Sequence, residues 1–291
     1  FNIILDNYGK IMRIKMREKF TQGTIIENMR SKKYPDLKCK GIVISARCDL
    51  EQDKIKFFHC LIALSMEDWI FEVLFKDIIE EKKKELFGII KQYVDKHPID
   101  FETLVKMGTD KAEIILMNCA NKNEKNNVEK WITSWKNLNL VSCEKMDRKK
   151  QQIYLKDNAA KLVERKIQQL HNSAYPKFAF VPIKAYCDND SPVDGLVVDL
   201  QDIIQVSIRI KEDILKCKYD FSDYKGDNRK EINEIFFFEN KDDFVIADNI
   251  IKSPWIEYIL QLFAHSFIRI GVDNALDYEI KEYCKKIVEV K

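Results

Sequence analysis

Five consecutive residues, Ser45–Asp49, bring a hydroxyl, a guanidinium, a thiol and a carboxylate together in the sequence SARCD. They follow a short apolar run typical of a buried strand, so we expect them where the chain leaves the core. In one interpretation, Asp49 caps the turn and Cys48 packs as a small hydrophobic group. In the other, Cys48 is a nucleophile activated by His59 on the next predicted strand. We favour the first interpretation.

A zinc site is a third alternative for the same segment, with Cys48, Asp49, His59 and Cys60 as the ligands. Neighbouring residues of a strand point to opposite faces, so His59 and Cys60 cannot easily bind one ion. We therefore expect no metal and no other cofactor. The sequence also lacks a P-loop, a Gly-rich dinucleotide fingerprint, GxSxG and HExxH, which are signatures of common enzyme classes.

A basic loop is the second group of candidates. Lys32, Lys33, Lys38 and Lys40 surround Tyr34 between the first two predicted strands. The lysines could bind the phosphates of a single-stranded nucleic acid while Tyr34 stacks on a base. The same composition is also typical of a solvated hairpin loop, which we favour.

The clearest helix covers residues 253–271 and carries an apolar stripe beside a polar one. The apolar stripe consists of Ile256, Ile259, Leu260, Phe263 and Phe267. On the polar stripe, we expect His265 to make a buried hydrogen bond. We expect Arg269 to pair with Asp49 or Asp199, which would fix the helix on the neighbouring strands.

The elements that position these residues follow from the apolar spacing. The predicted strands cover residues 20–28, 40–47, 55–65, 177–186 and 194–208. The predicted helices cover residues 67–96, 100–120, 127–139, 157–171, 253–271 and 275–289. Residues 1–19 fit either a strand or a helix.

These elements predict an α+β fold: a small β-barrel with a large helical insertion and C-terminal helices. The barrel core covers residues 1–66 and 175–250, the helical insertion covers 67–174, and the C-terminal helices at 251–291 pack on the barrel. Three strands cannot close a barrel, so we expect the two later strands to complete it.

The order and spacing of "QGTII", "GIVISARCDL" and "FFHCLIALS" resemble the small barrel of the PemK/MazF toxin class. Sequences of that class open with a G-D-I/V strand and continue with "PavVlS" and "vivaPiT" strands. The resemblance implies a barrel and metal-independent RNA cleavage, by an Arg before the second strand and a Thr or Ser ending the third. Ser65 matches the second of these positions. Cys39 or Lys40 stands where the Arg belongs, so Lys40 or Arg47 would have to replace it.

A second resemblance spans most of the chain. The S-x-x-C-D strand end (Ser45, Cys48 and Asp49), the "VVDL" strand at 197–200 and the "SPW…F…RIG" helix at 253–271 are similar to features of bacterial proteins often encoded near phage-defence genes. This implies an antiviral-defence or toxin–antitoxin setting and a protein partner encoded nearby.

Composition limits the possible partners and location. The 49 basic and 47 acidic residues give a net charge of +2, so an anionic partner must be held by a local patch. No apolar run approaches the roughly 18 residues that span a bilayer, and no signal peptide is evident, so we expect a cytoplasmic protein without membrane association. The eight cysteines include no CxxC pair and are expected to be reduced thiols. Since Phe1 is not Met, we expect N-terminal sequence to be missing.

The function we favour is non-enzymatic: an accessory, recognition or scaffold subunit that acts through protein–protein contacts. The first alternative is an endoribonuclease toxin that uses Ser65 with Lys40 or Arg47, with Asp49 and Cys48 as further catalytic candidates. The second alternative is nucleic-acid binding without cleavage, through the loop at 32–40. The oligomeric state does not follow from the sequence.

Overall fold

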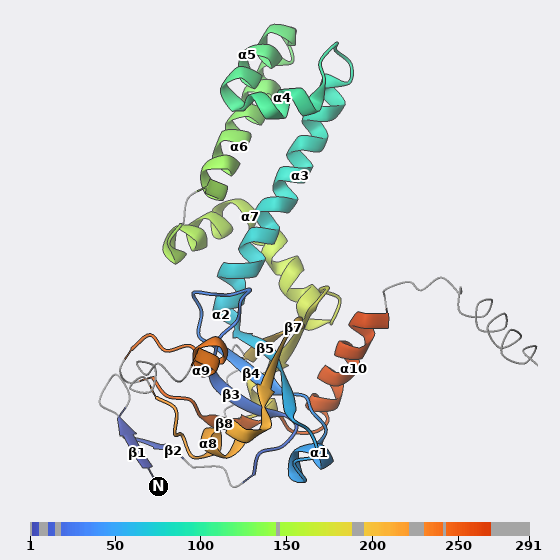
Figure 1. Cartoon of the computed structure of the whole chain (residues 1–291). Helices are drawn as coiled ribbons and strands as arrows, with labels where there is room; N and C mark the ends of the chain where they lie inside the picture. The colour runs from blue at the N-terminus through green and yellow to red at the C-terminus, as the bar shows by residue number, and fades with distance from the viewer. Residues whose placement is uncertain are drawn as a thin grey trace, which may run out of the picture. The chain divides into compact units, whose positions relative to one another are not determined.

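The chain forms two compact units, one of residues 1–65 with 175–291 and one of Met66–Ala174. We call the first the β unit and the second the helical unit, and each is described by itself. The computed structural model describes residues 2–5, 11–14, 19–143, 146–187, 195–220, 230–240 and 243–268 (Figure 1).

The β unit is built on a six-stranded antiparallel sheet in the order β6-β7-β5-β4-β3-β8. Its strands are β3 (Thr24–Met29), β4 (Cys39–Val43), β5 (Phe57–Ser65), β6 (Phe178–Pro182), β7 (Gly195–Ser207) and β8 (Ala247–Ile250). A separate two-stranded antiparallel sheet pairs β1 (Asn2–Leu5) with β2 (Ile11–Ile14). The helices of the unit are α1 (Arg47–Glu51), α8 (Lys211–Leu215), α9 (Lys230–Ile235) and α10 (Trp255–Ile268), with 3-10 turns η2 (Ile183–Ala185) and η3 (Ile208–Ile210).

The six-stranded sheet curls into a half-barrel, and the prediction of a closed barrel is wrong for the described strands. Register shifts interrupt the β3–β4, β3–β8 and β5–β7 ladders, and such bulges increase local twist and curl. Strands β6 and β8 remain the two edges of the sheet. A backbone hydrogen bond of 2.8 Å, from Lys252 N to Ala185 O, joins the segment after β8 to the turn after β6.

Helix α10 supplies the apolar surface that a closing strand would otherwise provide. Ile256 and Ile259 of α10 are fully buried in one core with side chains from the sheet. The sheet side of that core consists of Ile25, Ile42, Leu61, Ala63, Ala179, Val181, Leu196, Val198 and Leu200. Because the helix covers this face, the edges need not pair to exclude water from it.

Gly23 lies at the seam where three chain segments meet. Its backbone N–H donates to Val43 O at 2.8 Å, and its carbonyl accepts from Ile251 N at 2.9 Å. Its φ of +88° belongs to the left-handed region, and a Cβ there would lie 2.9 Å from Ile251 O. Only glycine fits this position without moving the backbone.

The helical unit contains α2 (Met66–Trp69), the π-helix η1 (Ile70–Leu74), α3 (Phe75–Val94), α4 (Phe101–Met107), α5 (Thr109–Cys119), α6 (Lys125–Cys143) and α7 (Arg148–His171). Helix α6 lies along α3, and α7 also contacts α3 (Figure 1). Phe87 of α3 makes edge-to-face contacts with Trp135 at 5.1 Å and Phe101 at 5.8 Å between ring centroids. The predicted helix at 100–120 is divided at Gly108, whose φ is +83°.

Two further predictions need correction. The SARCD segment does not end a strand, because β4 stops at Val43 and Arg47–Glu51 form α1. Helix α7 begins at Arg148, earlier than the predicted residue 157, with Asp147 accepting a hydrogen bond from Lys150 N as its N-cap. The predicted helix at 275–289 lies outside the described residues. Among the described helices, none combines the length and apolar character needed to cross a membrane.

Candidate functional site

A bulge in β7 places two carboxylates beside each other. Leu61 of β5 pairs with Ile203, whereas Ile62 pairs with Asp199, so Leu200–Asp202 are extra residues in β7. Asp199 Oδ1 accepts a hydrogen bond from Gln201 N at 3.0 Å, which stabilises the bulge. Strand alternation puts Asp199 on the face opposite the core that contains α10.

The loop between β3 and β4 binds both carboxylates. Lys33 Nζ forms an ion pair with Asp199 Oδ2, and Tyr34 Oη donates to the same oxygen at 2.8 Å. Ser31 Oγ donates to Asp202 Oδ2 at 2.5 Å and accepts from the backbone N–H of Lys33 and Tyr34 at 3.0 and 3.2 Å. We call these five residues, Ser31, Lys33, Tyr34, Asp199 and Asp202, the carboxylate clamp.

In the carboxylate clamp, two acidic side chains lie near one lysine. The Asp199 side chain has no exposed surface, while that of Lys33 is 46% exposed. Burial, and then the charge of Asp199, raise the pKa of the Asp202 carboxyl, although the hydrogen bond from Ser31 and the charge of Lys33 lower it. Burial and the charge of Asp199 also raise the pKa of the Tyr34 phenol, so Tyr34 remains a hydrogen-bond donor.

The chemistry open to the clamp is limited by this enclosure. A substrate can reach Asp199 only if the β3–β4 loop moves, because Lys33, Tyr34 and Gln201 surround its carboxylate. The Lys33 ammonium also lies 5.3 Å from the ring centroid of Phe178, which adds a cation–π contact. The arrangement therefore fits a structural role, in which it fastens a long loop to the bulged strand.

Replacing Asp202 with Asn is expected to increase the free energy of unfolding at pH 7. Because the pKa of Asp202 is raised by folding, its ionised form disfavours the folded state, and stability falls as pH rises above the usual Asp range. Asn is neutral and keeps an oxygen that accepts from Ser31. The gain over wild type should therefore be largest near pH 7 and disappear toward about pH 4, as measured by urea unfolding. Asp157→Asn, at an exposed position of α7, is the control, and a loss of stability in Asp202→Asn at pH 7 would contradict the argument.

The loop at 32–40 is less solvated, and its lysines are less free, than the sequence predicts. Tyr34 is 6% exposed, with its hydroxyl on Asp199, so its ring is not free to stack on a base. Lys33 is in the clamp, Lys38 binds Asp243 at 2.8 Å, and Lys40 binds Glu27 at 2.5 Å. Lys32 is exposed and has no ion pair with a described residue. Nucleic-acid binding by this loop stays a prediction, now with three of its four lysines paired.

The SARCD residues lie at the surface of the β unit. Cys48 is exposed, and its Sγ lies 3.6 Å from Asp49 Oδ1. Ser45 Oγ accepts from the backbone N–H of His59 at 2.9 Å, whereas no contact joins the His59 ring to Cys48 in the described residues. Cys60 is buried, and burial raises the pKa of its thiol. No group of three or more His, Cys, Asp or Glu residues that could hold a metal ion occurs in the part of the chain that the structure describes.

The residues of the nuclease hypothesis are not all brought together. Lys40 pairs with Ala63 across β4 and β5, so Lys40 and Ser65 are on the same face of the sheet. The Lys40 ammonium, however, is bound by Glu27. Arg47 lies on α1, with its guanidinium 4.0 Å from Glu257 of α10.

The polar residues expected to anchor α10 are also not placed as the sequence predicts. His265 is exposed, so the prediction of a buried hydrogen bond is wrong. It follows the buried Ile256 by nine residues, which at about 100° per residue places it on the opposite side of the helix. Arg269 lies outside the described residues, and Asp199 is held by Lys33 and Tyr34 from the face opposite α10. Asp49 is part of the first turn of α1.

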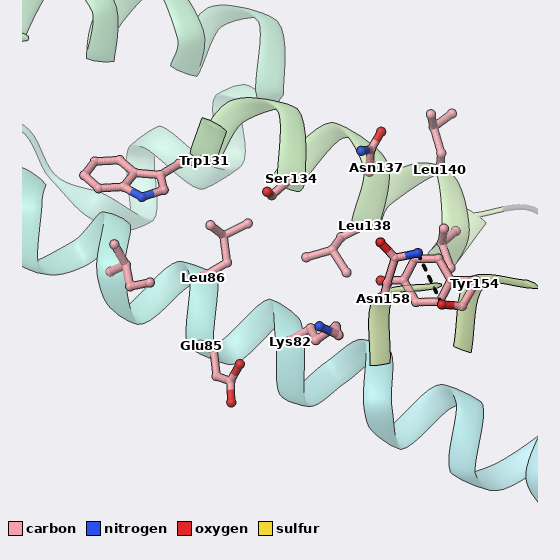
Figure 2. A pocket seen from close by; sticks show the side chains of 12 residues that line it. Lys82, Glu85, Leu86, Trp131, Ser134, Asn137, Leu138, Leu140, Tyr154 and Asn158 are labelled. Atoms are coloured by element: carbon pink, nitrogen blue, oxygen red, sulfur yellow. Dashed lines mark hydrogen bonds between the residues drawn. The ribbon is translucent and has the colours of Figure 1, made fainter. Parts of the chain in front are cut away.

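A groove of about 530 Å³ lies in the helical unit among α3, α6 and α7 (Figure 2). Leu86 projects from α3 into the space between α3 and α6, and Leu138 lies on the α6 side (Figure 2). Both leucines are buried, whereas Ile89 and Leu140 at the groove are 46% and 59% exposed. The full lining is Lys82, Glu85, Leu86, Ile89, Trp131, Ser134, Asn137, Leu138, Leu140, Val141, Tyr154 and Asn158.

The groove has an apolar floor and a polar margin. Asn158 Nδ2 donates to the backbone oxygen of Tyr154 at 3.2 Å, which leaves the Asn158 carbonyl oxygen as an acceptor (Figure 2). Ser134 and Asn137 of α6 are exposed. Burial raises the pKa of the Tyr154 phenol, so Tyr154 stays neutral. The groove can therefore bind an apolar surface and orient it by hydrogen bonds.

Neither the clamp nor the groove is predicted by the sequence patterns described above. For the clamp, the available signal was a carboxylate inside the apolar run 195–200, since a buried charge requires a partner. For the groove, the signal was weaker, because exposed apolar residues such as Ile89 and Leu140 continue an ordinary amphipathic pattern.

Comparison of the chain with protein-family models, with curated proteins and with solved structures gave no match. The function of this chain is therefore inferred from its own residues.

Proposed function

We propose that this chain is a recognition or scaffold subunit, without catalysis of its own, that binds a partner protein through the groove of the helical unit. The setting we propose is a bacterial antiviral-defence or toxin–antitoxin system, on the strength of the sequence resemblances alone. The observation that carries the binding proposal is the groove of about 530 Å³ with Ile89 and Leu140 exposed along it. Exposed apolar side chains gathered at a concave surface are typical of protein interaction sites.

The groove suits a helix of the partner. Two of its walls are the helices α3 and α6, and side chains of a third helix can interdigitate with theirs. Amphipathic helices bind such grooves through apolar residues at i, i+3 or i+4, and i+7. The nuclease alternative has less support than the docking groove. The carboxylates of the clamp are enclosed, and Lys40 is paired with Glu27.

A photocrosslinker in the groove tests the proposal. With p-benzoylphenylalanine in place of Ser134, the full chain expressed in its native cells should crosslink to one protein, identified by mass spectrometry. The same group in place of Lys122, outside the lining, should not capture that protein. Leu140→Asp should remove the crosslink and weaken binding at least about tenfold, because an apolar contact of the groove is replaced by a charge.

The matched control is Ile114→Asp on α5, since Ile114 is 63% exposed and lies outside the groove lining. Both substitutions are at exposed positions and should leave the melting temperature nearly unchanged. A missing crosslink at Ser134, or one that survives Leu140→Asp, would overturn the proposal.

A further inference from the structure

The charges around the groove suggest which kind of helix it binds. Lys82 lines the groove on α3, is partly buried, and has no described carboxylate within 4.0 Å. Among the lining residues the one acid is Glu85. The groove margin therefore offers a cation with no ion-pair partner in the described part of the helical unit.

Helical spacing adds more lysines to the same margin. Lys150 comes four residues before Tyr154, and Lys161 comes three residues after Asn158, so each is a surface neighbour of a lining residue of α7. On α6, Lys130 precedes Ser134 by four residues. All three lysines are exposed, and none forms an ion pair with a residue in the described ranges.

The acids near the groove do not balance this charge. By the same spacing, Asp157 follows Tyr154 by three residues and Glu81 precedes Glu85 by four, but Glu81 is already paired with Arg165 and Lys166. In the described part of the unit, two carboxylates without an ion pair, Glu85 and Asp157, thus stand against these four lysines around an apolar floor. Some cations elsewhere in the unit are paired, as Arg148 is with Glu67 at 3.0 Å and Asp68 at 2.5 Å.

We infer that the occupant of the groove is an acidic amphipathic helix of the partner protein, with an apolar face against Leu86 and Leu138 and carboxylates along its flanks. This inference rests on the proposed function of the groove. Carboxylates on the flanks of the bound helix would lie near Lys82, Lys130, Lys150 and Lys161. Charge complementarity of this kind accelerates association and excludes basic helices.

Two synthetic peptides test the inference by fluorescence anisotropy with the full chain. Each peptide is about 18 residues, or about 27 Å as a helix. Both carry leucine at i, i+3 or i+4, and i+7, and they differ only in having glutamate or lysine on the flanks. The glutamate peptide should bind at least about tenfold more tightly at low salt, and the difference should shrink in 1 M NaCl.

Variants identify the lysines responsible and separate the two proposals. Lys82→Glu with Lys150→Glu should reverse the preference, whereas Lys106→Glu with Lys122→Glu, at exposed lysines outside the lining, should preserve it. Equal binding of both peptides, lost in Leu140→Asp, would overturn the acidic-helix inference and keep the groove as a docking site. Binding that does not depend on Leu140, or no binding of either peptide, would overturn both.

Discussion

Replacing Lys33 with methionine should lower the free energy of unfolding by about 3 kcal/mol. The substitution leaves the Asp199 carboxylate, which has no exposed surface, without its ion-pair partner. Removing one member of a buried pair costs about 3–5 kcal/mol, because the remaining charge is uncompensated. We expect the lower end of this range, since the Lys33 side chain is 46% exposed and water already weakens the pair. Urea unfolding at pH 7 measures the change.

The neighbouring Lys32 is the control for this prediction, because it is exposed and has no ion pair with a described residue. Lys32→Met should change stability by no more than about 0.5 kcal/mol. Adding Asp199→Asn to Lys33→Met should recover part of the loss, because the buried charge is then removed. Equal stabilities of Lys33→Met and Lys32→Met would show that the clamp does not stabilise the fold.

The second large effect is expected at α10, where Ile256→Ala should lower the free energy of unfolding by about 2–5 kcal/mol. Ile256 is fully buried in the core that α10 shares with the half-barrel. Truncation removes its buried methyl groups and leaves a cavity in the core cluster that also contains Ile42 and Leu61. Thermal and urea unfolding of the full chain measure the loss.

His265→Ala on the exposed side of the same helix is the matched control, with an expected change within about 0.5 kcal/mol. A loss equal to that of Ile256→Ala would mean that α10 is oriented differently on the sheet. Near wild-type stability of Ile256→Ala would mean that the helix contributes little to the core.

The sequence predicts elements best where the apolar pattern is continuous. The run at 57–65 contains successive buried residues and is correctly predicted as a strand, and the three- and four-residue spacing after Trp69 correctly predicts α3. The pattern fails at SARCD because a five-residue helix such as α1 has too few turns to show a period. The break at Gly108 depends on a left-handed residue that apolar spacing does not detect.

Closure of the sheet depends on contacts that local patterns do not encode. The apolar faces of β6 and of the segment after β8 are compatible with two arrangements. The two edges can pair with each other and close a barrel, or they can stay unpaired while a helix covers the apolar face. The buried side chains of α10, which are visible in the sequence, are the deciding feature. Predicting the half-barrel would have required knowing which surface the apolar stripe of α10 covers.

The clamp also depends on contacts between residues far apart in the sequence, here in a polar segment. "RSKKYPDLKCK" has the composition of a solvated loop, and nothing near it in sequence indicates burial of Tyr34. Its partner Asp199 lies 165 positions later in the chain. The need of Asp199 for a partner was predictable, but the choice of Lys33 and Tyr34 over Arg269 required the strand order.

The insertion of the helical unit between paired strands also bears on how the chain folds. Ser65 at the end of β5 pairs with Leu196 of β7 (196 − 65 = 131 positions), so this ladder closes a very long loop. Closing such a loop in a disordered chain costs entropy that grows with its length, and distant contacts of this kind slow folding. Helices of Met66–Ala174 are stabilised by local contacts, so their early formation would condense the intervening chain before the two strands must meet.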